Sequence, residues 1–169
     1  MGRWLPTAHQ ISPQTSPPEA LWGKPDAFDT AATTFGNVAA ISGLRAAEPA
    51  LRYGRLYFRE VSGNGHDFGH PAGSGGVVAF SRILADREVT VVANCSTAQT
   101  FTGAVLRDPN IGTATVTVGY SNLETTGTSI TGFVDNAEFY DGSTRTGSGP
   151  AVTAPVVLRP REIQVLVPA

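Results

Sequence analysis

The sequence is poor in cysteine, in lysine and in charged residues generally. Its single cysteine, Cys95, excludes an intramolecular disulfide framework and a cysteine-based metal cluster. Lys24 is the only lysine among 12 Lys and Arg residues, and charged residues make up 15% of the chain. This composition argues against a charged helical bundle or coiled coil. Because the net charge is −2 and no basic stripe is present, we also expect no nucleic-acid partner.

Long apolar runs are missing as well. No run approaches the ~20 residues that cross a bilayer, so we expect no membrane partner. The N-terminus lacks the pattern of a signal peptide, in which basic residues precede an apolar stretch. The expected location is therefore cytoplasmic or unknown. Glycine and proline are abundant instead, with 19 and 12 residues. The length of 169 residues suits one domain with a short appendage.

The chain divides by pattern into an arm, a helix and a β domain. Prolines from Pro6 to Pro25 interrupt residues 1–25, which predicts an irregular arm. Residues 26–47 carry apolar side chains at three- and four-residue spacing, which predicts one amphipathic helix. Pro49 ends this helix, because the residue before a proline avoids the helical conformation. The predicted segments are the arm, 1–25, a helical segment, 26–52, and a β domain, 53–169.

From residue 53 the pattern changes to short β-prone runs separated by turn residues. The predicted strands cover 53–61, 77–84, 88–94, 101–107, 113–120, 152–158 and 163–167, with weaker strands at 130–134 and 137–140. Residues 63–76 and most of 121–149 read as loops. Short strands at this spacing predict a mainly β fold, an antiparallel Greek-key-type β-sandwich preceded by one helix. In the 77–94 hairpin we expect Val78, Phe80 and Ile83, together with Val89, Val91 or Val92, to contribute to the buried core.

One loop carries residues that suit a metal ion. His66, Asp67 and His70 offer imidazole and carboxylate groups, which bind zinc and other transition ions. A helix would place the two histidines on one face, but Gly65, Gly69 and the following proline make a helix improbable here. A polar loop with solvated histidines is therefore the favoured interpretation. We predict no metal and no other cofactor.

Sugar binding would need exposed aromatic rings, because pyranose rings stack on flat π faces. The candidates are Tyr120, Tyr140 and Trp22, with Trp4, Phe133 and Phe139 as further aromatic residues of the same regions. Core packing is the favoured interpretation for the two phenylalanines. The carboxylates lie scattered in predicted turns and loops, with no pair in a catalytic motif, so we predict no catalytic residue.

Three stretches together carry a family resemblance. They are PALRYGR at 49–55 with Leu44 and Arg45 before it, VVAFSRIL at 77–84 with EVTVVAN at 88–94, and LRPREIQVL at 158–166. Their order and spacing resemble the C-terminal part of α-amylase-family glycoside hydrolases. In that family the last helix of a (β/α)8 catalytic barrel leads into a β-sandwich called domain C. The resemblance covers roughly residues 26–169, with 121–149 poorly matched.

The resemblance implies a module without catalysis of its own. The family's aspartate nucleophile, glutamic acid and second aspartate lie on barrel strands, and no position of this chain matches them. The resembled full-length proteins are retaining α-glycoside hydrolases or transglycosylases. We therefore expect a non-catalytic C-terminal β-sandwich module that packs on or stabilises a barrel absent from this chain, and that also contacts α-glucan. The chain would then be a fragment, a separately encoded remnant or one piece of a split protein.

Two alternatives stay open at this point. The first is a free-standing carbohydrate-binding or adhesive β-sandwich. The second is a small hydrolase or metalloenzyme built on His66, Asp67 and His70. The predicted helix adds a question of its own, because its apolar side chains need cover from a barrel or from a second copy of the chain. Those side chains are Phe28, Phe35, Val38, Ile41 and Leu44.

Overall fold

The computed structural model describes residues 30–70, 76–111, 115–123 and 127–169. The chain divides into two compact units, 1–38 and 39–169. The predicted arm, 1–25, lies outside the described residues, and so does the start of the predicted helix. Within the described ranges, no helix is long and apolar enough to cross a membrane.

A main helix and a short second helix precede the strands. α1 spans Thr33–Ala47, within the predicted range, and α2 spans Pro49–Tyr53. Pro49 follows the end of α1, as predicted, and it also stands in the first turn of α2. At this position the fixed φ of proline suits the helix, and its missing N–H costs nothing because the first N–H groups of a helix have no partner within the helix. The expected strand at residue 53 starts later, because residue 53 still belongs to α2 and β1 begins at Arg55.

The rest of the described chain is mainly β, which confirms the predicted class. The strands are β1 (Arg55–Phe58), β2 (Val61–Ser62), β3 (Asp67–Gly69), β4 (Val77–Leu84), β5 (Arg87–Asn94), β6 (Phe101–Leu106), β7 (Thr115–Ser121), β8 (Ser129–Asp141), β9 (Thr144–Leu158) and β10 (Ile163–Pro168). Most predicted strands recur within a few residues of their expected bounds.

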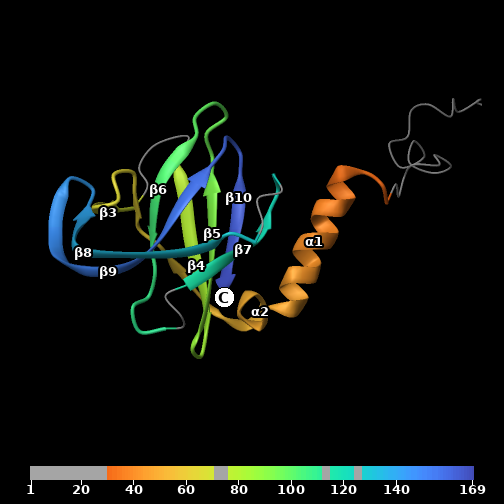
Figure 1. The fold of residues 1–169 in the computed structure, drawn as a ribbon, viewed down its shortest axis with the longest axis horizontal. Helices are drawn as coiled ribbons and strands as arrows, with labels where there is room; N and C mark the ends of the chain where they lie inside the picture. Colours follow the sequence, from red (N-terminus) through yellow and green to blue (C-terminus); the bar gives the residue numbers. More distant parts are fainter. Residues whose placement is uncertain (1–29, 71–75, 112–114, 124–126) are drawn as a thin grey trace, which may run out of the picture. The chain divides into compact units, whose positions relative to one another are not determined.

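The strands pair in the order β1-β4-β5-β10-β7-β8-β3-β2-β6-β9, and β8 also pairs with β9. The strands β8, β3, β2, β6 and β9 therefore close into a ring, and β1, β4, β5, β10 and β7 form an open sheet (Figure 1). β8 joins the two parts, because its residues 129–131 pair with β7 and residues within 132–141 pair with β9. Among the described pairings, only β3–β8 is parallel. The sequence did not predict the closed ring.

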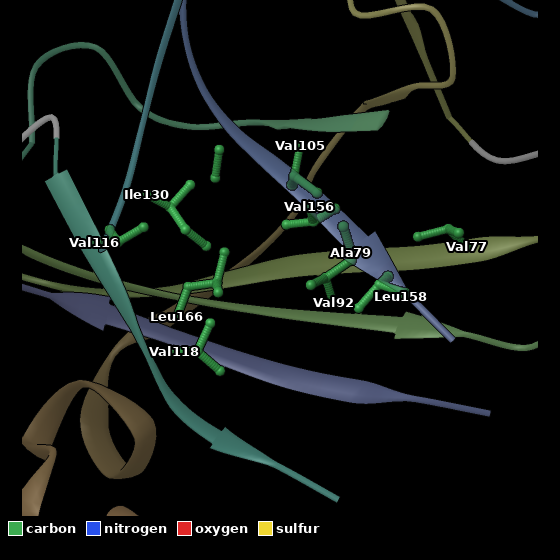
Figure 2. Close-up of a cluster of buried hydrophobic side chains, with 11 residues drawn as sticks. Val77, Ala79, Val92, Val105, Val116, Val118, Ile130, Val156, Leu158 and Leu166 are labelled. Carbon is green, nitrogen blue, oxygen red and sulfur yellow. The ribbon is translucent and has the colours of Figure 1, made fainter. Parts of the chain in front are cut away.

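The main core lies between the open sheet and the ring. Val92 and Leu166 of the open sheet meet Val105 and Val156 of the ring in one cluster of buried side chains (Figure 2). Its other buried members are Val77, Ala79, Val116, Val118, Ile130, Ala154 and Leu158. Close packing of branched aliphatic side chains from both parts holds the β domain together.

The β4–β5 hairpin forms as predicted, but the inner face of β4 differs in part from the expected one. Val77 and Ala79 point into the core, whereas Val78 is 41% exposed and Phe80 is half-buried. The expectation was therefore wrong for Val78 and Phe80, which lie on the outer face. Ile83 is half-buried on the same face as Val77 and Ala79, and Val89 and Val92 are fully buried, as expected. The hairpin is apolar on both faces, so the two-residue alternation could not identify the inner one.

Two regions that were predicted to be mostly loops contain strands, although β8 covers both weaker strands expected at 130–134 and 137–140. Within the predicted loop 63–76, β3 buries Phe68 completely against Phe139 of β8, with ring centroids 6.4 Å apart. Within 121–149, β8 and β9 form a long hairpin that turns at Gly142, whose φ is +59°. Small and polar residues dominate this hairpin, so its sequence carried little hydrophobic signal.

Candidate functional site

The outer face of the open sheet, opposite the main core, is apolar from edge to edge. Strand register aligns Phe58, Phe80, Val91, Val165 and Tyr120 in one row, and Val78, Ala93 and Ile163 in the next. We call these eight residues the outer apolar face. Successive residues of a strand alternate between the two faces of a sheet. Both faces of the open sheet therefore carry apolar side chains, although only one of them lines the main core.

The end of α1 and all of α2 cover one part of the outer apolar face. Leu44, Ala50 and Leu51 pack with Tyr120 and Val165 in a second apolar cluster. Figure 1 shows α2 beside the lower ends of the open-sheet strands. This cover starts at the point where the chain enters the β domain.

The remainder of the outer apolar face stays open among the described residues. A groove of about 320 Å³ runs between the helices and the sheet, with Ile41 on the helix side and Phe80 and Ile163 on the sheet side. Ile41 is 46% exposed and Ile163 is 41% exposed. At the sheet edge, Phe58 is 66% exposed. Exposed apolar patches of this kind mark interaction surfaces in soluble proteins.

A buried ion cluster fixes the sheet beneath this face. The carboxylate of Glu88, which is fully buried, accepts a hydrogen bond from Arg59 at 2.6 Å and another from Ser81 at 2.6 Å. Arg107, 1% exposed, lies 3.4 Å from the other carboxylate oxygen. Buried charges are tolerated only when they are paired in this way. The cluster ties β1 to β4 and β5 and fixes the rows of the outer apolar face.

A second buried carboxylate organises the turn between β9 and β10. Glu162 is 1% exposed and accepts hydrogen bonds from the Ser121 hydroxyl, from the side chain of Gln164 and from the backbone N–H of Arg159. Burial alone would raise the pKa of Glu162, but these hydrogen bonds outweigh it and lower the pKa to about 2. The turn is therefore held by an ionised side chain.

The three candidate metal ligands, for which a solvated polar loop was the favoured interpretation, come together only in part. His66 Nδ1 lies 2.6 Å from Asp67 Oδ1, and a carboxylate oxygen of Glu138 completes a group whose atoms all lie within 4.8 Å of one another. Glu138 was not among the predicted ligands. Hydrogen bonds from His66 and Asn64 lower the pKa of Asp67.

His70 does not belong to this group. It lies near Glu60, where it opposes the effect of burial, which raises the pKa of that carboxyl group. Its place in the metal set was a prediction from spacing alone. Glu138 reaches this group through the parallel pairing of β3 with β8, which joins residues about 70 positions apart in the sequence. Such a pairing leaves no local sequence pattern, so no signal in the sequence pointed to Glu138.

The predicted sugar-stacking residues lie in different settings. Tyr120 is only 7% exposed in the second apolar cluster, so little of its ring is available for stacking. Tyr140 is half-buried and donates a hydrogen bond to Glu138 at 2.6 Å. Trp22 lies outside the described residues. Phe133, for which core packing was favoured, is instead 60% exposed beside a groove of about 340 Å³.

The three stretches that carried the family resemblance meet in one place. Arg55 pairs with Ile83 across β1 and β4, and Ile163 pairs with Ala93 across β10 and β5. The side-chain amide of Asn94 donates to the carbonyl groups at 158 and 159. Residues far apart in the sequence thus build one continuous unit around the open sheet. Comparison of the chain with known proteins finds no matching family, no matching curated protein and no matching solved structure.

Proposed function

We propose that this chain is a non-catalytic β-sandwich module of the α-amylase type, which packs on and stabilises a catalytic barrel that the chain itself does not contain. The observation that carries the proposal is the outer apolar face, which α1 and α2 cover only in part. Burial of each large apolar side chain is worth about 1.5–3 kcal/mol, so a second body on this face would gain substantial stability.

The position of the two helices supports the same proposal. The resemblance makes α1 the last helix of the barrel, and α1 leads directly into the covered part of the outer apolar face. A barrel that included α1 would lie next to the open groove at Ile41 and Ile163. The core between the open sheet and the ring also supports a relation to the Greek-key β-sandwich, with the ring as a local elaboration.

The exposed face has a consequence that sedimentation velocity can measure on the chain alone. Without a barrel, the outer apolar face should drive association that increases with protein concentration. Phe58→Asp should reduce this association, because Phe58 is 66% exposed and its replacement leaves the core intact. Phe133→Asp is the matched control, since this equally exposed phenylalanine lies on the ring. A chain that stays monomeric at every concentration, or two variants that behave alike, would contradict the proposal.

Contact with α-glucan is a second candidate function, for which Phe133 is the specific observation. Its exposed ring lies beside the 340 Å³ groove together with Asn64, Thr102 and Thr153. An aromatic ring with nearby hydroxyl and amide groups suits stacking and hydrogen bonding to a sugar. Affinity electrophoresis in gels containing amylopectin tests this function. Retardation that Phe133→Ala abolishes would support it, and equal migration with and without glucan would contradict it.

A further inference from the structure

Two carboxylates face each other across the only parallel pairing among the described strands. The register of β3 and β8 aligns Asp67 with Glu138, and the backbone N–H of Glu138 donates to the carbonyl of His66 at 3.0 Å. Like charges placed directly opposite on a sheet repel each other. Each carboxylate is therefore held by donors: His66 and Asn64 for Asp67, Tyr140 and Arg145 for Glu138.

The arrangement also holds an imidazole nitrogen beside both carboxylates. One ring nitrogen of His66, an oxygen of Asp67 and an oxygen of Glu138 all lie within 4.8 Å of one another. Metal–ligand bonds of about 2.0–2.2 Å require ligand atoms no more than about 4.2 Å apart. Rotation of the exposed His66 and Asp67 side chains and of the half-buried Glu138 side chain would have to bring the ligand atoms within that distance. An open hollow of about 460 Å³ adjoins Asp67 and Tyr140, which leaves room for water molecules as further ligands.

We propose that His66, Asp67 and Glu138 bind one transition-metal dication, for which Zn²⁺ is the probe. One imidazole and two carboxylates form a mixed nitrogen and oxygen ligand set, which suits zinc and its neighbours. Calcium prefers six to eight oxygen ligands, so Ca²⁺ should bind much more weakly. The site lies on the ring, and its existence does not depend on the proposed packing against a barrel.

Replacement of Arg145 should change the metal affinity in the opposite direction to replacement of a ligand. Its guanidinium lies 3.0 Å from Glu138 Oε1, so a bound metal must compete with it for this carboxylate. Arg145 is 52% exposed in its side chain, and its replacement leaves the buried residues in place. Arg145→Gln should therefore increase metal affinity, whereas the loss of any ligand should decrease it.

The test is isothermal titration calorimetry of the full chain with Zn²⁺, and a parallel titration uses Ca²⁺. We expect one ion per chain, with affinity reduced about tenfold or more by His66→Ala and by Glu138→Gln, and increased several-fold by Arg145→Gln. His70→Ala is the matched control and should leave the affinity unchanged, because His70 lies outside the group. Thermal unfolding in EDTA verifies that each variant is folded.

A spectroscopic measurement complements the titration. Co²⁺ in place of Zn²⁺ should give visible absorption bands that are lost in His66→Ala and kept in His70→Ala. Absence of Zn²⁺ binding would overturn the proposal. So would binding that survives His66→Ala, binding that depends on His70, or an affinity that Arg145→Gln lowers.

Discussion

Glu48 and Arg87 form a bidentate ion pair that joins the helices to the β4–β5 hairpin. Nε and Nη2 of Arg87 each donate to one carboxylate oxygen of Glu48, at 2.7 Å in both cases. Hydrogen bonding to Glu48 raises the pKa of Arg87. Because Glu48 is the residue between α1 and α2, the pair fixes the junction of the two helices to the β4–β5 hairpin.

The first prediction concerns this pair. A double-mutant cycle with Glu48→Ala and Arg87→Ala should give a coupling energy of about 1–2 kcal/mol in urea titrations. Arg87→Lys keeps the charge but loses the planar fork, so it should retain only part of the coupling. A coupling below about 0.3 kcal/mol would mean that the pair does not hold the helices in place.

The second prediction concerns the buried Glu88 cluster. Glu88→Ala removes the buried carboxylate that pairs with Arg59 and Arg107, and removal of one partner of a buried ion pair costs about 3–5 kcal/mol. The exposed turn residue Asp86 provides the matched control, and Asp86→Ala should change stability by less than about 0.5 kcal/mol. Equal effects of the two substitutions in a denaturant titration would contradict this role of Glu88.

The third prediction concerns pH and rests on Glu162. Its pKa is about 2 in the folded chain against an ordinary value of 4.5, so the unfolded state binds the proton more readily. The contribution of Glu162 to stability is complete above about pH 4.5 and is lost as the pH falls towards 2. The full loss amounts to about 3 kcal/mol.

Urea titrations between pH 6 and pH 2 measure this contribution. Glu162→Gln should be less stable than the native chain at pH 6, and the difference should shrink as the pH falls. Asp141→Asn, at an exposed position of the β8–β9 hairpin, should leave the pH profile unchanged. A native profile that Glu162→Gln reproduces in full would mean that another group causes the acid sensitivity.

The fourth prediction compares two phenylalanines of the ring. Phe68 is fully buried in a cluster with Ala104, Ala137 and Ala151, so Phe68→Ala should cost about 3–5 kcal/mol. Phe133 is 60% exposed, so Phe133→Ala should lower the free energy of unfolding by less than about 1 kcal/mol in the same experiment. Similar losses for both would show that the ring does not have its core at Phe68.

The sequence was informative where local pattern determines structure. The end of α1 and both strands of the β4–β5 hairpin were predicted close to their bounds, because helical spacing and β-branched runs are local signals. The start of α1 was not, since the helix begins at Thr33 and residues 30–32 form a turn. The inner face of the hairpin was not, because Val78 and Phe80 are as apolar as the residues that face the core. An open apolar face and a buried one look identical in a sequence.

The ring and the metal group depend on pairings between distant residues. Phe68 is the one large apolar side chain of a glycine-rich loop, and only its contact with β8 explains its burial. Glu138 joins His66 and Asp67 through the same parallel pairing. A sequence without aligned relatives carries no record of such contacts, so neither the ring nor this ligand could be predicted.

The most direct test of the central claim is capture of this chain by a catalytic barrel. The probe is a panel of α-amylase-family barrels, each expressed without its last helix and its C-terminal domain, so that α1 and the β domain must supply both. Co-purification should be seen with the native chain and with Phe133→Asp, and the complex with the native chain should also recover starch hydrolysis. Co-purification should be lost with Phe58→Asp, which places a charge on the outer apolar face. If no barrel is captured, or if Phe58→Asp is captured as well as Phe133→Asp, the outer apolar face is not a barrel-docking surface.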